Sequence, residues 1–173
     1  DSTTLIDTIK VFNLPTATII GKSIVCLTPG ITLQYTSTIS SVDGIAKYKW
    51  SIDIDSVANT PDLNYNYRVP GNHNITLDIQ TVNGCTYSLT KAIVIDSIVS
   101  NFELTPVEIC GSGTVTFTNQ TSHYAAISNW LWSFGDGSNF NGIDNSHTYT
   151  NPGNYTVKLI GTTINGCTDS TTL

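Results

Sequence analysis

The most informative part of the sequence is the segment Trp130-Leu131-Trp132-Ser133-Phe134-Gly135-Asp136-Gly137-Ser138. Its three aromatic residues alternate with smaller ones, so their side chains share one side of an extended strand, which predicts a buried face. The two glycines flank Asp136 directly afterwards, and glycine accepts the positive φ angles of a sharp reversal. The segment therefore predicts a strand that packs on a core and ends in a tight turn. Tryptophans stacking on sugars are the less favoured interpretation.

Short alternating strands occur throughout the chain. Apolar and polar residues alternate at Val115–Thr118, Tyr155–Leu159 and Ile75–Ile79, with the period of two of a half-buried strand. Turn pairs such as Pro70-Gly71 and Asn83-Gly84 separate these runs at short intervals. Sustained helical periodicity is absent, so the pattern predicts an all-β fold of antiparallel sandwiches.

The sequence repeats itself after 82 residues. Residues 50–85 align with residues 132–167 without a gap and with 14 identities, from the Trp-Ser pair to the Asn-Gly-Cys triplet. Asp1–Leu5 is identical to Asp169–Leu173, which indicates a third, partial copy. We expect residues 1–14 to be the terminal strand of a preceding repeat plus a linker, followed by repeats at 15–97 and 98–173, the latter with its last strand truncated. Such a chain would be a segment of a longer tandem array.

The composition argues against nucleic-acid binding and against membrane insertion. Seven Lys and Arg against thirteen Asp and Glu give a net charge of −6 and a pI near 4.6, which argues against nucleic-acid partners. No apolar run approaches the ~18 residues of a membrane span, so we expect no membrane insertion.

The four cysteines are far apart and form no CxxC pair, which favours disulfides in an oxidising compartment over metal sites or buried thiols. The preferred pairing lies within each repeat, Cys26–Cys85 and Cys110–Cys167. The alternative joins successive repeats, as in Cys26–Cys167. The sequence leaves both open.

Candidate sites for chemistry are sparse. Asp136 could bind Ca²⁺ with Asp144 or backbone carbonyls as further oxygen ligands. A calcium loop presents several carboxylates at short spacing, and here only one lies in the turn, so a turn aspartate that caps its own backbone is the favoured interpretation. The histidines His73, His123 and His147 form no pattern with Cys or Glu, and no nucleophile motif is present. We expect no catalytic residues, no enzyme activity and no cofactor.

The second repeat resembles the PKD domain family. The segment quoted above, His147-Thr148-Tyr149 and Pro152-Gly153-Asn154-Tyr155 occur in the order typical of that signature. The first repeat is a degenerate relative, in which Ile52-Asp53-Ile54-Asp55 replaces Phe-Gly-Asp-Gly. The resemblance implies an extracellular immunoglobulin-like β-sandwich with Tyr149 as a corner tyrosine. The expected structural motif residues are Trp50, Tyr67, Trp132, Phe134, Gly135, Asp136, Gly137, Tyr149, Pro152 and Gly153.

The cysteines and Leu14–Thr18 are similar to PKD arrays in surface and secreted proteins of Bacteroidota, including gliding-motility adhesins and proteins exported by the type IX system. This resemblance implies non-catalytic spacer repeats of a cell-surface filament or adhesin, with neighbouring PKD repeats and other surface proteins as partners. The alternative is a binding module of a secreted hydrolase that holds polysaccharide or protein. Asp-Ser/Thr triplets also resemble the O-glycosylation acceptor of that phylum, which would place glycans on Ser2, Thr8, Ser56, Ser97 and Ser170.

Overall fold

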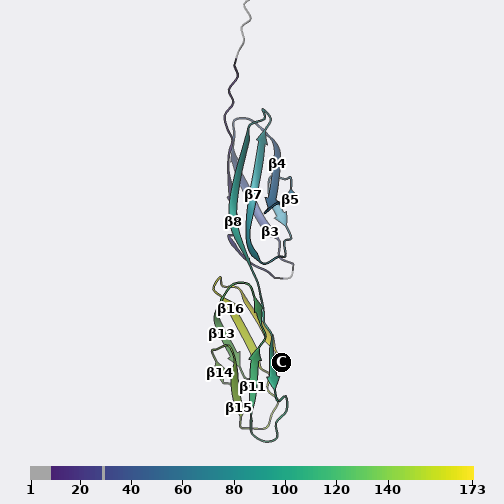
Figure 1. The fold of residues 1–173 in the computed structure, drawn as a ribbon, viewed down its shortest axis with the longest axis vertical. Coiled ribbons are helices and arrows are strands. Elements are labelled where there is room, and N and C mark those ends of the chain that lie inside the picture. The colour runs from purple at the N-terminus through teal and green to yellow at the C-terminus, as the bar shows by residue number, and fades with distance from the viewer. Residues whose placement is uncertain (1–8, 29) are drawn as a thin grey trace, which may run out of the picture. The chain divides into compact units, whose positions relative to one another are not determined.

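The computed structural model describes residues 9–28 and 30–173, and these residues form strands and turns without a helix (Figure 1). Accordingly, no helix within these ranges is long and apolar enough to cross a membrane. The pairing is antiparallel except between β2 and β8, and the predicted all-β fold class is confirmed. The strands are β1 (Thr16–Ile20), β2 (Ile24–Cys26), β3 (Leu33–Ser40), β4 (Ile45–Ile52), β5 (Asp55–Ala58), β6 (Leu63–Tyr65), β7 (Gly71–Thr81), β8 (Thr86–Asp96), β9 (Ile98–Val99), β10 (Phe102–Thr105), β11 (Gly113–Asn119), β12 (Ser122–His123), β13 (Ile127–Ser133), β14 (Asn139–Phe140), β15 (Asn145–Tyr149), β16 (Lys158–Thr163) and β17 (Thr168–Thr172).

The chain divides into two compact units. The first comprises Asp1–Ser23, Gly30–Tyr67 and Asn72–Ile93, and the second comprises Ile24–Pro29, Arg68–Gly71 and Val94–Leu173. The short strand β2 therefore belongs to the second unit, although it lies early in the chain. Residues 9–15 form no strand, and the rest of the segment predicted as the end of a preceding repeat, residues 1–8, lies outside the described residues.

The first unit has a core between two sheets. One sheet has the order β1-β3-β6, and the other contains β8-β7-β4-β5. Alternate residues of β7 are buried, as a strand with one face on a core requires. Trp50 is completely buried and its indole Nε1 donates a hydrogen bond to the carbonyl oxygen of Thr60, at 3.0 Å. The indole therefore fills the core without leaving its polar atom unpaired.

The second unit repeats this plan with sheets β10-β11-β15 and β14-β13-β16-β17. Its core is aromatic: Trp132 and Phe134 are buried as predicted, and Phe102 meets Trp132 edge to face with 5.0 Å between ring centroids. Nε1 of Trp132 donates to the carbonyl oxygen of Gly142 at 3.1 Å. Trp130 is half-buried on the same face of β13, where it covers Gly161 of β16. The strand quoted at the outset therefore packs as its alternation predicts.

Candidate functional site

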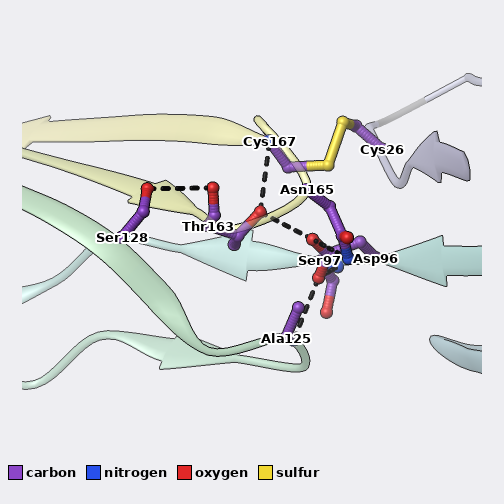
Figure 2. The surroundings of a disulfide bond; sticks show 8 residues. All are labelled: Cys26, Asp96, Ser97, Ala125, Ser128, Thr163, Asn165 and Cys167. Carbon is purple, nitrogen blue, oxygen red and sulfur yellow. Dashed lines mark hydrogen bonds between the residues drawn. A yellow bond between two sulfur atoms is a disulfide. The ribbon is translucent and has the colours of Figure 1, made fainter.

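One disulfide joins Cys26 to Cys167, with 5.4 Å between Cα atoms and 141 residues between them in sequence (Figure 2). Cys85 and Cys110 are free thiols. The preferred pairing within each repeat is therefore wrong, and the alternative Cys26–Cys167 is correct.

The register of β2 explains the pairing. Cys26 lies opposite Asp96, at the end of β8, whereas Cys85 precedes the start of that strand. An extended strand of this length separates the two positions by roughly 36 Å, far beyond the reach of a disulfide. In the second unit, Cys110 lines the same open cavity as Val157, the residue before β16, whereas Cys167 follows the end of β16. Neither of the preferred pairs can therefore meet.

A buried carboxylate lies beside the disulfide. Asp96 is 0% exposed, and its two oxygens accept four hydrogen bonds (Figure 2). Oδ1 accepts from the backbone N–H groups of Ser97 at 2.8 Å and Ala125 at 3.0 Å. Oδ2 accepts from the hydroxyl of Thr163 at 2.6 Å and the amide of Asn165 at 3.1 Å. The carboxylate thus connects β8 to two loops of the second unit.

These hydrogen bonds keep Asp96 ionised. Burial by itself would raise the pKa of the carboxyl, but the donors from Thr163, Ala125, Asn165 and Ser97 outweigh it and hold the pKa below its usual range. Burying a carboxylate costs free energy unless hydrogen-bond donors replace the water it has lost. Removing one of these donors would therefore destabilise the fold. The arrangement fits a fixed structural anchor.

Thr163 links this carboxylate to the disulfide. Its hydroxyl donates to Asp96 and accepts a hydrogen bond from the backbone N–H of Cys167 at 3.1 Å. Its own N–H donates to the carbonyl oxygen of Cys167 at 2.8 Å. We call Asp96, Thr163, Asn165 and the Cys26–Cys167 disulfide the cross-link cluster. In sequence, Asp96 stands out only as part of a glycosylation triplet and as a single charge inside the largely apolar run Ala92–Val99, and the second pattern is the one that indicates a buried carboxylate.

The turn after β13 uses Asp136 as a cap. Its Oδ1 accepts from both the N–H and the hydroxyl of Ser138, and its Oδ2 contacts Nε2 of His147 at 2.7 Å. These bonds, that from the Ser138 hydroxyl above all, hold the pKa of Asp136 well below its usual range. Asp144 lies elsewhere and accepts from the N–H of Asn119 at 2.8 Å. Asp136 and Asp144 therefore accept hydrogen bonds from separate parts of the backbone, and the described residues contain no group of three metal-ligating side chains.

Ser138, His147 and Asp136 have the residue types of a hydrolytic triad but not its geometry. Nε2 of His147 faces both Asp136, at 2.7 Å, and the hydroxyl of Ser138, at 3.3 Å. A triad requires the carboxylate on one ring nitrogen and the nucleophile on the other. The His147 ring also stacks on Phe134 with centroids 4.3 Å apart. The arrangement stabilises the turn and cannot relay a proton from serine.

Tyr149, at the end of β15, forms a hydrogen bond to the backbone of the same turn. Its hydroxyl donates to the carbonyl oxygen of Phe134 at 2.9 Å, a main-chain tie of the kind expected of a corner tyrosine. Burial, followed by the charge of Asp136 and the neighbouring Tyr155, raises the pKa of Tyr149 to about 12. In the first unit, Tyr67 is half-buried and contacts Nδ1 of His73 at 3.4 Å instead.

An open cavity of about 670 Å³ lies beside this tyrosine in the second unit. Its wall includes Ile109, Cys110 and the predicted turn residues Pro152 and Gly153. Tyr155 also lines it and stacks on Tyr149 with ring centroids 4.3 Å apart. Polar and apolar groups thus share an accessible concave surface.

The proposed glycan acceptors differ in accessibility. Ser56 and Ser170 are exposed, on β5 and β17, whereas Ser97 is half-buried beside Asp96. Ser2 and Thr8 lie outside the described residues. Glycosylation stays a prediction at all five positions.

Comparison with known proteins identifies the second unit. Residues 101–173 match the family model of the PKD domain. The PKD1 domain of Vibrio anguillarum Epp is 32% identical, over 44% of this chain and 87% of that domain, with a TM-score of 0.39. The three N-terminal domains of the bacteriophage RB49 highly immunogenic outer capsid protein give a TM-score of 0.55 at 10% identity, over 92% of this chain and 67% of that one. Fibronectin(III)-like modules of Clostridium thermocellum CbhA give 0.47 at 13% identity, over 91% and 92%.

Proposed function

Residues 101–173 belong to the PKD domain family, and from this premise we propose that the chain is a non-catalytic structural spacer of an extracellular protein. PKD domains are extracellular modules. The Cys26–Cys167 disulfide fits an oxidising compartment of this kind, because such bonds persist outside the reducing cytosol.

The observation that carries the proposal is the span of the disulfide. Tension applied to the two ends of the chain would pass from Cys26 to Cys167 through the sulfur atoms, bypassing residues 27–166. Those residues include every strand from β3 to β16 and all of the second unit's aromatic core. Force would therefore reach only residues 1–26 and 167–173, which suits a load-bearing spacer.

The cross-link cluster supports the same role. Asp96 accepts hydrogen bonds from the hydroxyl of Thr163 and the amide of Asn165, and these two residues flank the turn that carries Cys167. The position of Cys167 within the second unit is therefore fixed by Asp96. The low content of charged residues, 12%, leaves a surface of small neutral groups with few ionic contacts to offer passing molecules.

Single-molecule stretching between the termini tests this role. With the disulfide intact, the folded chain is expected to lengthen by no more than on the order of 110 Å, the extended length of the residues outside the loop. After reduction, a further ~480 Å of residues 27–166 becomes extensible. Equal lengthening in both states would contradict the proposal, and the Cys85→Ser variant, which keeps the disulfide, is the control.

We further propose that the protein is a surface filament or adhesin, with other PKD repeats and filament proteins as its partners. The PKD arrays of Bacteroidota gliding adhesins and type IX-exported proteins resemble it in sequence. Sequencing of the complete gene tests this: adjoining PKD repeats are expected, and an adjoining catalytic domain would favour the alternative below.

The alternative function is a binding module for polysaccharide or protein in a secreted hydrolase. The open cavity beside Tyr155 favours it, since mixed polar and aromatic concave surfaces accommodate such ligands. Pull-down with insoluble polysaccharides and collagen tests it. If the chain is retained on one of these materials and the Tyr155→Ala variant is not, the binding module replaces the spacer proposal. If the chain is not retained, the cavity does not bind these ligands.

A further inference from the structure

The turn at free Cys85 is a structural duplicate of the turn at bonded Cys167. The N–H of Cys85 donates to the hydroxyl of Thr81 at 3.1 Å, and the N–H of Cys167 donates to that of Thr163 at 3.1 Å. The glycine N–H between them donates to the threonine carbonyl at 3.0 Å in both turns. Gly84 and Gly166 adopt φ angles of 89° and 81°. The free thiol is thus presented by the same backbone as the bonded one.

The agreement extends beyond the turns. Asp62 accepts from the N–H of Ser37, and 82 residues later Asp144 accepts from that of Asn119. The core tryptophans Trp50 and Trp132 donate to carbonyl oxygens that are also 82 residues apart. Equivalent sequence positions therefore hold equivalent structural positions in the two repeats.

Free Cys110 corresponds to bonded Cys26. Cys110 follows Cys26 by 84 residues, and each comes after a β-branched apolar residue, Val25 or Ile109, that packs inward. Both free thiols can be reached, since Cys110 is exposed and Cys85 is half-buried. The disulfide joins Cys26, the counterpart of Cys110, in repeat 15–97, to Cys167, the counterpart of Cys85, in repeat 98–173. Each free cysteine therefore corresponds to a bonded one: Cys110 to Cys26, which bonds to a cysteine of the Asn-Gly-Cys turn, and Cys85 to Cys167, which bonds to a cysteine of the Cys26 type.

We propose that Cys85 and Cys110 form the same type of disulfide as Cys26–Cys167, but with cysteines of neighbouring repeats. Cys110 forms a disulfide with the Asn-Gly-Cys turn of a following repeat, and Cys85 forms one with the Cys26-type cysteine of a preceding repeat. This inference rests on the proposed spacer function and names its partner, a further copy of the same repeat. Successive loops of this kind overlap, so that tension would pass along a series of disulfides.

The reaction balances with a disulfide oxidant. Two cysteine thiols lose two protons and two electrons as the S–S bond forms, and one molecule of a small-molecule disulfide such as oxidised glutathione is reduced to two thiols. A thiolate attacks the oxidant first, and the resulting mixed disulfide is displaced by the second cysteine.

A lengthened chain provides the test. Because Leu173 aligns with Lys91, residues 92–173 repeated after Leu173 continue the repeat in register. The addition supplies a second Val94–Asp96 segment, which is the strand that β2 pairs with, and a second Cys167. After refolding in a glutathione redox buffer, peptide mapping is expected to show Cys26–Cys167 and a new bond from Cys110 to the added copy of Cys167, with Cys85 remaining alkylatable.

A displaced thiol serves as the matched control. The lengthened chain with Cys110→Ser and Val107→Cys carries an exposed cysteine three positions away, since Val107 is 80% exposed. It is expected to leave the added Cys167 free. If Cys110 remains fully alkylatable, or if the displaced thiol forms the bond equally well, the inference is overturned.

The outcome is separable from that of the proposed function. The peptide map reports only which sulfurs are joined, whereas the stretching and pull-down experiments report load bearing and ligand binding. A chain that binds polysaccharide can still form the new bond, and a load-bearing chain can leave Cys110 as a thiol.

Discussion

The first and second units build the same strand-end turn from different side chains. Asp53 and Gly135 occupy equivalent positions, with φ angles of 55° and 82°, both in the left-handed region. In the second unit, a Cβ at Gly135 would lie 2.7 Å from the carbonyl oxygen of Thr156. In the first unit, Asp53 accommodates its side chain, and the carboxylate accepts from the N–H of Asn74 at 2.9 Å and contacts His73 at 2.7 Å.

The comparison shows that the main-chain geometry is constant while the side-chain chemistry varies. Each unit has an Asp–His contact of 2.7 Å at this turn, but from non-equivalent positions, Asp53–His73 and Asp136–His147. In both aspartates these contacts lower the pKa of the carboxyl. The cysteine turns differ in the same way, with one backbone and either a disulfide or a free thiol. Matched substitutions in the two units therefore separate backbone effects from side-chain effects.

The largest difference is expected between the two cysteine turns. Replacing the disulfide by Cys26→Ser and Cys167→Ser removes a loop closure that contributes about 5 kcal/mol in the chain-entropy treatment for a separation of 141 residues. Cys85→Ser, at a free half-buried thiol, is expected to change the unfolding free energy by less than about 0.5 kcal/mol. Calorimetry under non-reducing conditions measures both. Equal thermal shifts would show that the cross-link does not stabilise the fold.

The second largest effect concerns the strand-end glycines. Gly135→Ala combines an unfavourable φ with a Cβ pressed against the backbone of Thr156, and we expect a loss of about 3–4 kcal/mol. Gly137→Ala has a φ of 93° but open space around its Cβ, so only the conformational cost of about 1–2 kcal/mol is expected. Urea unfolding of the two variants compares them. Similar losses would mean that the close approach to Thr156 relaxes freely.

The third comparison tests the cross-link cluster. Thr163→Val removes a donor from buried Asp96 and an acceptor from the N–H of Cys167, and we expect a loss of about 2–3 kcal/mol. Thr81→Val, in the equivalent turn, removes the acceptor of Cys85 N–H and is expected to cost about 1 kcal/mol.

The pH dependence of the same pair sharpens the test. The pKa of Asp96 is lowered in the folded chain, so its contribution is complete above the unfolded value near 4 and is lost as the pH falls through the folded value. Without the Thr163 donor the folded pKa rises toward the unfolded value, so the contribution at neutral pH shrinks and its loss on acidification, which still begins near pH 4, is complete at a higher pH. Unfolding measured from pH 7 to pH 2 should show this for Thr163→Val but not for Thr81→Val.

Local patterns in the sequence predicted the strands and the buried residues. They did not predict the disulfide or the hydrogen bonds of Asp96, because these depend on which distant strands pair. Alternation placed Trp132 and Phe134 in the core, because strand parity is a property of neighbouring residues. The disulfide depends on the parallel pairing of β2 with the end of β8, which brings Cys26 opposite Asp96. That pairing joins segments about seventy residues apart, and the spacing of the cysteines does not encode it. The hydrogen bonds of Asp96 depend on the same distant loops.

The smallest effect is expected at the corner tyrosines. Tyr149→Phe removes a buried hydrogen bond to Phe134 and should cost about 1 kcal/mol at neutral pH. The pKa of Tyr149 is raised to about 12 by burial, so the folded chain disfavours its ionisation. The stabilising contribution is complete below pH 10, the ordinary value for tyrosine, and is lost between pH 10 and about 12.

Tyr149→Phe should therefore lose less stability than the parent chain over that alkaline interval. Tyr67→Phe is the matched control, since Tyr67 is half-buried and its pKa is raised by weaker burial and by Asp53 and Asp55. Urea unfolding at pH 8, 10 and 11.5, with both free thiols alkylated to prevent disulfide exchange, measures the difference. If both variants retain the alkaline loss of the parent, the raised pKa of Tyr149 does not control it, and the hydrogen bond to Phe134 contributes to the turn without making it sensitive to pH.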